Sequence, residues 1–494
     1  MAKLLDGITG HPKALYMLFF TEMWERFTFY GMRALLILFM TSQLFYPDAK
    51  ANHIYGSYQA LVYAMPLFGG MLADRLLGFR RSIVFGGIVM ALGSFVMAIP
   101  SEVAFYVGMG FIVVGNGFFK PNISSIVGKL YAENDPRRDS GFSLFYMGIN
   151  VGALFGGLAC GYVGQQINWH LGFGLAGIFM IVGLFVFNKG KHLLEGKGEA
   201  ADESALSRPS FIGLRADRSV YLLAVCCIPV FAATLWYYKV MDYVFNPLGI
   251  AALVYLLYLA FSQKERAAKQ MMFAAIAMIF FSVLFWGFYE QAGGSLNLYA
   301  LRNVDLSLFG GQESAAAVNN GVNPLLVILL SPVFAVLWVW LSSRRIEPNT
   351  PMKFGLAFLQ LALGFYMFIL GGKFSDNGMV PLIYFVLGYM FLSSGELCLS
   401  PIGLSMITKL SPAKLVGMMM GAWFLASAFG QFVAGKVGAM MAMPTVDGES
   451  TLPPVESLAI YSGVFQDIAY ISLGAGILIL LLSPILKKWM HGIH

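Results

Sequence analysis

Residues 22–33 read EMWERFTFYGMR and place four ionisable side chains inside an apolar segment that runs from about residue 15 to residue 39. On a helix that turns about 100° per residue, Glu22, Glu25, Arg26, Tyr30 and Arg33 share one arc of about 140°. The remaining surface is Leu, Phe, Met and Ile, which can face lipid. Charges in hydrocarbon are costly unless paired or hydrated, and they usually mark a substrate or proton path. The stretch therefore predicts a membrane helix with one charged face.

The composition excludes an ordinary soluble protein, because 58% of the 494 residues are hydrophobic and only 12% are charged. Apolar runs of about twenty residues favour helices over a β-barrel, so the predicted fold class is an all-α polytopic membrane protein. The four cysteines and six histidines have no metal-ligand or catalytic spacing. We therefore expect no enzyme, no metal and no cofactor. We attribute the net charge of +6 to basic cytoplasmic loops, and we expect no nucleic-acid partner.

The apolar runs predict fourteen membrane helices, arranged as two sets of six with two between them. The predicted domains are residues 1–188, a linker and two-helix insertion at 189–270, and residues 271–494. Lys and Arg concentrate in the loops on one side of the membrane, which predicts an inner-membrane protein with both termini cytoplasmic. The predicted spans are 13–42, 52–74, 82–100, 103–128, 140–166, 170–188, 219–240, 247–263, 271–300, 319–343, 352–371, 380–408, 414–440 and 459–486.

The two sets of six share short matches at corresponding places. FKPN at 119–122 matches LSPI at 399–402, and ALFG at 153–156 matches SAFG at 427–430. Duplicated six-helix halves are typical of transporters that rock about a site at the membrane midplane.

The intramembrane charges are divided unequally between the halves. The first half holds Glu22, Glu25, Arg26, Arg33 and Lys120, and the second holds Glu290 and Glu396. If the halves face each other across a cavity, a zwitterion fits, with its carboxylate at Arg33 and Lys120 and its ammonium at Glu396. The alternative is buried ion pairing that holds helices together, since Glu22 and Arg26 are four residues apart and Lys120 can pair with Glu25.

Buried carboxylates can also carry protons, and Glu22, Glu25 and Glu290 are the candidates. Aromatic and amide side chains accompany these charges, and for each of them helix packing is the alternative to substrate contact. They are Tyr30, Tyr63, Asn150, Trp286, Tyr289, Asn323 and Trp423.

The segment GMLADRLLGFRR, residues 70–81, joins the second and third spans on the predicted cytoplasmic side. Its glycines permit a tight turn, and Asp74 and Arg75 can hold helix ends together by charge pairing. Gating is the functional interpretation, and retention of the loop by its positive charge is the alternative.

These motifs together resemble a known family. The 70–81 segment resembles the cytoplasmic loop motif of the major facilitator superfamily. ExxERFxFYG at 22–31 resembles the first-helix motif of its proton-dependent oligopeptide transporter family. Motifs in four later helices are similar to that family too, and the two extra helices are typical of its bacterial members. They are FFKPN at 118–122, FYxxINxG at 145–152, FWxxYEQ at 285–291 and GEL at 395–397.

The resemblance implies a fold of two six-helix bundles and proton-driven import of di- and tripeptides by alternating access. It implies peptide-carboxylate contacts at Arg33, Lys120 and Asn150 and ammonium contacts at Glu396 and Asn323. It also implies a proton-coupling network of Glu22, Glu25, Arg26, Lys120 and Glu290, and an extracellular gate between Arg33 and Glu290. The pocket lining that it implies is Tyr30, Tyr63, Trp286 and Trp423. We expect a protein that functions as a monomer in lipid.

Two residues depart from the family pattern. Phe29 stands where Tyr is common, which removes a hydroxyl near the charged face, and Gly56 stands where animal members carry a histidine. The proton must therefore be carried by carboxylates. The alternatives to peptide symport are transport of another small anion or amine-bearing metabolite on the same fold, and a peptide sensor that does not transport.

Overall fold

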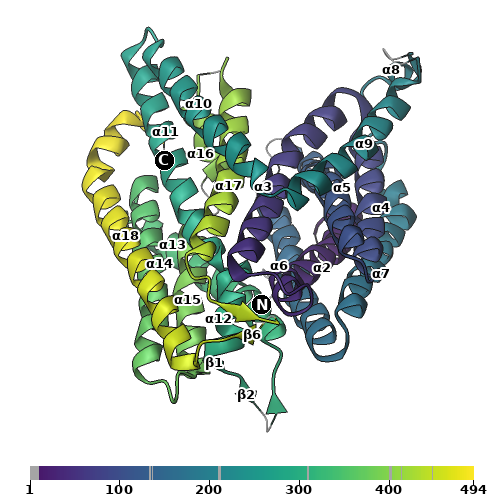
Figure 1. Cartoon of the computed structure of the whole chain (residues 1–494). Coiled ribbons are helices and arrows are strands. Elements are labelled where there is room, and N and C mark those ends of the chain that lie inside the picture. The colour runs from purple at the N-terminus through teal and green to yellow at the C-terminus, as the bar shows by residue number, and fades with distance from the viewer. Residues whose placement is uncertain are drawn as a thin grey trace. The chain divides into compact units, whose positions relative to one another are not determined.

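The computed structural model of this chain describes residues 10–132, 135, 137–209, 213–308, 311–399, 403–412, 414–447 and 449–493. Residues 400–402, which belong to one of the predicted repeat matches, lie outside these ranges. Long helices dominate the chain (Figure 1). Among the described residues, 13 helical spans are long and apolar enough to cross a membrane. The predicted all-α membrane class is confirmed.

The long helices follow the predicted spans. α2 does not belong to the 13 apolar spans because of its charges, although its 30 residues are long enough to cross a bilayer. The long helices are α2 (Lys13–Ser42), α3 (Asp48–Leu72), α4 (Phe79–Met97), α5 (Glu102–Lys129), α6 (Arg138–Tyr162), α7 (Trp169–Gly190), α9 (Ala216–Trp236), α10 (Val240–Phe261), α11 (Arg266–Tyr289), α13 (Ala315–Ser343), α14 (Thr350–Lys373), α15 (Leu382–Leu399), α17 (Val416–Ala439) and α18 (Pro454–Trp489).

Shorter elements lie between them. π-helical turns η1 (Ala73–Leu77) and η2 (Val163–Ile167) extend α3 and α6, and a 3₁₀ turn η3 (Lys191–Leu194) follows α7. Two-residue strands pair as β1 (Val304–Asp305) with β4 (Val380–Pro381), β2 (Ser307–Leu308) with β3 (Gly311–Gln312), and β5 (Thr445–Val446) with β6 (Glu449–Ser450). The remaining short helices are α8 (Glu203–Ser207), α12 (Ser295–Asn303) and α16 (Gly403–Leu410).

One predicted span is interrupted within the described residues. The span predicted at 271–300 ends as α11 at Tyr289, and a 3₁₀ turn η4 (Glu290–Gly293) and Gly294 separate it from α12. Gly294 has φ −109° and ψ −106°, a conformation far from helical. Two consecutive glycines at this point weaken the helix. The span predicted at 380–408 is helical on both sides of residues 400–402, as α15 up to Leu399 and as α16 from Gly403.

The chain folds into two compact units. Unit 1 comprises residues 1–36, 61–237 and 316–324, and unit 2 comprises residues 37–60, 238–315 and 325–494. The inserted helix α9 belongs to unit 1 and the inserted helix α10 to unit 2. The three-part division at residues 188 and 270 stays a prediction.

Glycines set the helix packing within unit 1. A Cβ added to Gly86 of α4 would lie 2.6 Å from the carbonyl oxygen of Gly115 in α5, and one added to Gly93 would lie 2.9 Å from that of Gly108. Such close approach of two backbones is how membrane helices gain van der Waals contact without a hydrophobic driving force. α4 and α5 therefore pack closely along their length (Figure 1).

A glycine also permits close packing of two helix backbones within unit 2, at Gly56 of α3. A Cβ there would lie 2.6 Å from the Cα of Gly435 in α17. A side chain at position 56 therefore has no room beside α17.

Candidate functional site

The charged stretch of α2 forms a buried ionic cluster in unit 1. Arg26 is 1% exposed and lies between two carboxylates. Its Nε is 3.3 Å from Glu22 Oε1, and its Nε and Nη2 both donate to Glu25. The predicted pairing of Glu22 with Arg26 is present, and Glu25 is the closer partner.

The cluster holds two carboxylates for one guanidinium. Glu22 and Glu25 are both buried, and Glu22 Oε2 has no hydrogen-bond partner among the described residues. Buried polar atoms almost always have a partner, and exceptions often mark functional groups. The second oxygen of Glu22 is therefore an open position for a proton.

Helix α6 holds this part of α2 in place. A Cβ on Gly152 would lie 2.1 Å from the carbonyl oxygen of Met23, and one on Gly156 would lie 2.3 Å from that of Phe27. The two backbones touch on either side of the ionic cluster. Asn150, one turn earlier on α6, donates its Nδ2 to the carbonyl of Tyr146 in its own helix at 3.1 Å.

Aromatic rings accompany the three cations predicted within the membrane spans of this unit. The Arg33 guanidinium lies 5.7 Å from the centre of the Tyr30 ring, and the Lys120 ammonium lies 4.7 Å from that of Tyr63. Arg26 lies 5.1 Å from the centre of the Phe29 ring, and that ring is buried. Cations over aromatic faces are stabilised by the electrostatic field of the ring. Phe29, the departure from the family pattern, lies against Arg26.

Unit 1 thus holds most of the predicted site residues. The predicted carboxylate-binding residues and the predicted gating pair Asp74 and Arg75 all fall in it. Asn323 also falls in unit 1, although the resemblance implies that it shares an ammonium-binding role with Glu396 of unit 2. Unit 2 holds Trp286, Glu290, Glu396 and Trp423.

In unit 2, Glu396 of α15 has a tyrosine partner. The hydroxyl of Tyr289 in α11 donates a hydrogen bond to Glu396 Oε2. The Tyr289 ring stacks on Phe285 with centroids 5.7 Å apart and meets Trp286 edge-on at 5.3 Å. The hydroxyl fixes the orientation of a half-buried carboxylate, which suits a group that receives a cationic ligand.

Glu290 is the first residue of the turn η4 and is 4% exposed. Its neighbour Gln291 donates to the carbonyls of Gly287 at 2.9 Å and Ala434 at 3.0 Å, which ties the turn to α17. The ring of Trp423 leaves no room for a Cβ on Gly403, so it packs against the start of α16. Glu290 therefore sits at a break in its helix that the neighbouring α17 stabilises.

Two features of this site are absent from the sequence-based prediction. The first is the hydrogen bond from Tyr289 to Glu396. The only feature of the sequence that points to it is the aromatic hydroxyl next to Glu290. The second is a buried ion pair in unit 2, where the Arg302 guanidinium contacts Asp48 at 2.5 and 2.9 Å. The amide of Met443 also donates to Asp48 at 3.2 Å. Both charges fall outside the predicted spans, so hydropathy gave no reason to pair them.

Asp74 and Arg75, predicted as gating residues, are exposed in η1 and make no ion pair with the residues that the structure describes. Two ion pairs in the neighbouring part of unit 1 come from Arg80 and Arg81. Arg80 contacts Glu199 at 2.6 Å, and Arg81 contacts Glu203 at 2.8 Å. The linker after α7 is thereby attached to the start of α4.

Comparison with known proteins agrees with the fold and the motifs. The PTR2 model of the POT family matches residues 80–453. An uncharacterized transporter of Bacillus subtilis, YclF, is 37% identical, with 99% of this chain and 96% of that protein covered. Dipeptide and tripeptide permease B of Salmonella typhimurium is 32% identical over 98% of this chain and 97% of its own length. A crystal structure of the peptide transporter POT in complex with sulfate superposes with a TM-score of 0.83, at 35% identity, covering 98% of this chain and 97% of the other.

Proposed function

Because this chain belongs to the POT family, we propose that it imports di- and tripeptides together with protons by alternating access. The chain is a multi-pass membrane transporter and not an enzyme. The name of the Salmonella permease supports the peptide substrate, and the charges of the chain support both the substrate and the proton.

The buried cluster of Glu22, Glu25 and Arg26 is the observation that carries the proposal. It holds one carboxylate more than its arginine can neutralise, and one oxygen of Glu22 has no hydrogen-bond partner among the described residues. Lys120 is a second cation that acts electrostatically on Glu22, so the two carboxylates face two positive charges. The oxygen of Glu22 that has no hydrogen-bond partner is the position where a proton can bind and leave during the transport cycle.

The substrate roles follow the charge of each unit. Arg33, Lys120 and Asn150 of unit 1 bind the peptide carboxylate, and Glu396 of unit 2 binds its ammonium, with Asn323 as a further contact. Arg33 and Lys120 lie beside aromatic rings, and Tyr289 orients Glu396. Tyr30, Tyr63, Trp286 and Trp423 contact the peptide side chains.

Proton coupling uses Glu22, Glu25, Arg26, Lys120 and Glu290, and the inward proton gradient replaces any cofactor. Gating uses Arg33 with Glu290, and Asp74 with Arg75 at the other end of the helices. The protein works as a monomer in the inner membrane. Both termini are cytoplasmic, an orientation that the distribution of Lys and Arg favours.

The test is uptake of labelled dialanine into proteoliposomes with and without an inward proton gradient. We expect accumulation only with the gradient, together with acidification of the lumen. N-acetyl-dialanine and dialanine amide should compete at least about tenfold less well than dialanine, because each removes one charge-assisted contact. Uptake of sulfate or nitrate that survives Glu396→Gln, with no dialanine uptake, would indicate an anion transporter. Dialanine binding without transport or acidification would indicate a sensor.

A further inference from the structure

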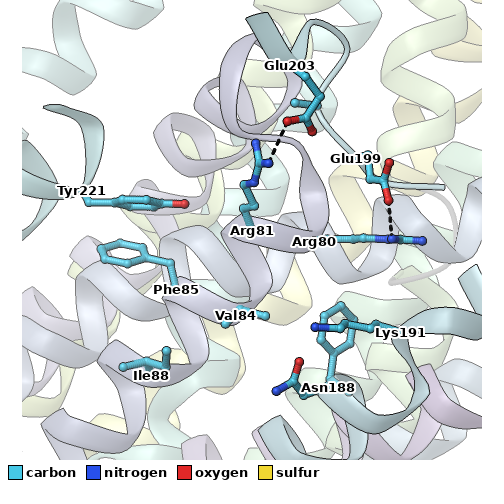
Figure 2. Close-up of a pocket in the computed structure, with 12 residues that line it drawn as sticks. Arg80, Arg81, Val84, Phe85, Ile88, Asn188, Lys191, Glu199, Glu203 and Tyr221 are labelled. Atoms are coloured by element: carbon cyan, nitrogen blue, oxygen red, sulfur yellow. Dashed lines mark hydrogen bonds and ion pairs between the residues drawn. The ribbon is translucent and has the colours of Figure 1, made fainter. Parts of the chain in front are cut away.

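A cavity of about 650 Å³ lies in unit 1, and none of its lining residues is assigned to transport. It is bounded by the start of α4, the end of α7 with η3, the linker that follows, and α9 (Figure 2). Its lining residues are Arg80, Arg81, Val84, Phe85, Ile88, Phe187, Asn188, Lys191, Glu199, Ala200, Glu203 and Tyr221.

The polar end of the cavity carries more positive than negative charge. Arg80 and Arg81 each meet one carboxylate through a single nitrogen, Nη1 to Glu199 and Nη2 to Glu203. A guanidinium has five N–H donors, so each arginine retains donors for a further acceptor. Lys191 is exposed and makes no ion pair among the described residues. Figure 2 shows its side chain pointing toward Val84.

The two glutamates are weak competitors for these cations. Glu199 and Glu203 are 55% and 57% exposed, whereas Arg80 is 18% exposed. Exposed ion pairs contribute little stability, because water solvates both partners well. An anion that enters the cavity can therefore share the guanidinium groups or displace the glutamates.

The opposite end of the cavity is apolar. Val84, Phe85 and Ile88 follow the arginines along α4, and the Phe85 ring packs on Tyr221 with centroids 4.7 Å apart (Figure 2). Ile88 is 46% exposed on a membrane-spanning helix. From Arg81 to Ile88 the helix rises about 10 Å, which is the step from headgroup to acyl chain in a bilayer leaflet.

We propose that this cavity binds an anionic phospholipid, with the phosphate at Arg80, Arg81 and Lys191 and an acyl chain along Phe85 and Ile88. The apolar end favours a lipid over a free phosphate, which needs only the polar end. The cytoplasmic leaflet is the source when the basic side faces the cytoplasm. Because the same residues attach the 191–208 linker to α4, a bound headgroup holds the linker and the helix end together. This inference does not depend on the identity of the transported substrate.

The experiment is native mass spectrometry of the full-length protein titrated with phosphatidylglycerol and with phosphatidylcholine of identical acyl chains. We expect tighter binding of phosphatidylglycerol and an affinity about fivefold lower in Lys191→Gln, since each basic residue near an anionic lipid contributes about that factor. Lys191→Arg should restore the affinity. Lys189→Gln is the matched control, because Lys189 is exposed near the end of α7, two residues before Lys191, and does not line the cavity. It should change binding by about twofold or less.

The variant Glu203→Gln distinguishes a lipid-binding site from a purely structural role of the ion pair between Arg81 and Glu203. If the carboxylate competes with the lipid phosphate for Arg81, its removal tightens phosphatidylglycerol binding, whereas loss of binding overturns the proposal. Equal affinities for the two lipids, or equal losses in Lys189→Gln and Lys191→Gln, also overturn it. Inorganic phosphate that displaces phosphatidylglycerol at a similar concentration would show a soluble anion site instead. Thermal unfolding of each variant checks that it is folded, and Arg81→Gln replaces any variant that is not.

Discussion

At the scale of single residues, Glu22 differs from Glu25 in how its oxygens are used. Glu25 accepts two bonds from Arg26, whereas Glu22 offers that arginine one oxygen and leaves the other without a partner among the described residues. The two carboxylates, only three residues apart, therefore have different surroundings. Glu25 is the closer partner of Arg26, and Glu22 is the carboxylate to which we assign the proton in the proposed function.

Glu22→Gln should abolish the response to a proton gradient without abolishing peptide binding. The amide keeps the size of the side chain and cannot release a proton, so the coupling between proton and peptide is lost. We expect the ratio of dialanine uptake with and without a gradient to fall to about one, while exchange of peptide across the membrane continues.

Glu102→Gln is the control for this change, because Glu102 is exposed at the start of α5. It removes the same charge and should leave the gradient response intact. Gradient-driven accumulation by the Glu22→Gln protein at the wild-type level would assign the proton to another carboxylate.

Tyr289→Phe should weaken peptide binding. It removes the hydroxyl that orients Glu396, and a hydrogen bond to a charged group is worth about 1.5–3 kcal/mol, or about tenfold or more in affinity. Tyr299→Phe is the control, because the buried hydroxyl of Tyr299 has no hydrogen-bond partner among the described residues. Competition binding with labelled dialanine measures both, and equal effects of the two changes would contradict a specific role for Tyr289.

At the scale of helices, the buried pair of Asp48 and Arg302 joins the start of α3 to the end of α12. The Arg302 side chain is 9% exposed and the Asp48 side chain is 0% exposed. Asp48→Asn leaves a buried guanidinium without its counter-charge, which typically costs about 3–5 kcal/mol. The loss should appear as a lower midpoint of thermal unfolding.

The double variant Asp48→Asn with Arg302→Met gives the matching test. Removal of both charges should recover part of the stability lost in the single variant, because no uncompensated charge remains. Additive losses in the two single variants would mean that the pair does not act as a unit.

Gly152 of α6 is a second test at this scale. Gly152→Ala places a Cβ 2.1 Å from the carbonyl oxygen of Met23, so α6 must move away from the ionic cluster of α2. Such overpacking should cost about 1–3 kcal/mol in unfolding free energy and slow proton-driven uptake. Gly463→Ala on α18 is the control, since nothing lies within 4 Å of its added Cβ. Equal unfolding midpoints for the two variants would contradict the close contact.

The helices could be predicted from the sequence, because an apolar run long enough to span a bilayer must satisfy its backbone hydrogen bonds internally, and a helix does so. The break at Gly293 and Gly294 could not be predicted, because glycine is common inside membrane helices. Only tertiary contacts, such as the hydrogen bond from Gln291 to Ala434, decide whether a helix breaks there. The bond from Tyr289 to Glu396 joins residues 107 apart in sequence, and the pair of Asp48 with Arg302 joins residues 254 apart. One-dimensional patterns carry no information on such partners. The Glu22, Glu25 and Arg26 cluster could be predicted because its members share one helix face.

At the scale of the whole molecule, the distribution of Lys and Arg predicts which side of the membrane each loop faces. In a background without native cysteines, Lys197→Cys in the linker should be protected from a membrane-impermeant maleimide in intact cells and labelled after permeabilisation. Ser307→Cys, on the short hairpin of β2 and β3, should be labelled in intact cells. The reverse pattern would place both termini outside.

The contact between Gly56 and Gly435 limits how this protein can change over evolutionary time. With the two backbones in contact, any mutation that introduces an imidazole at position 56 meets a steric penalty before it can offer a new route for protons. A side chain at position 56 would fit only after other mutations had moved α3 away from α17. Those mutations would weaken the packing of the two helices. The local packing therefore restricts position 56 to glycine for as long as α3 and α17 keep this contact.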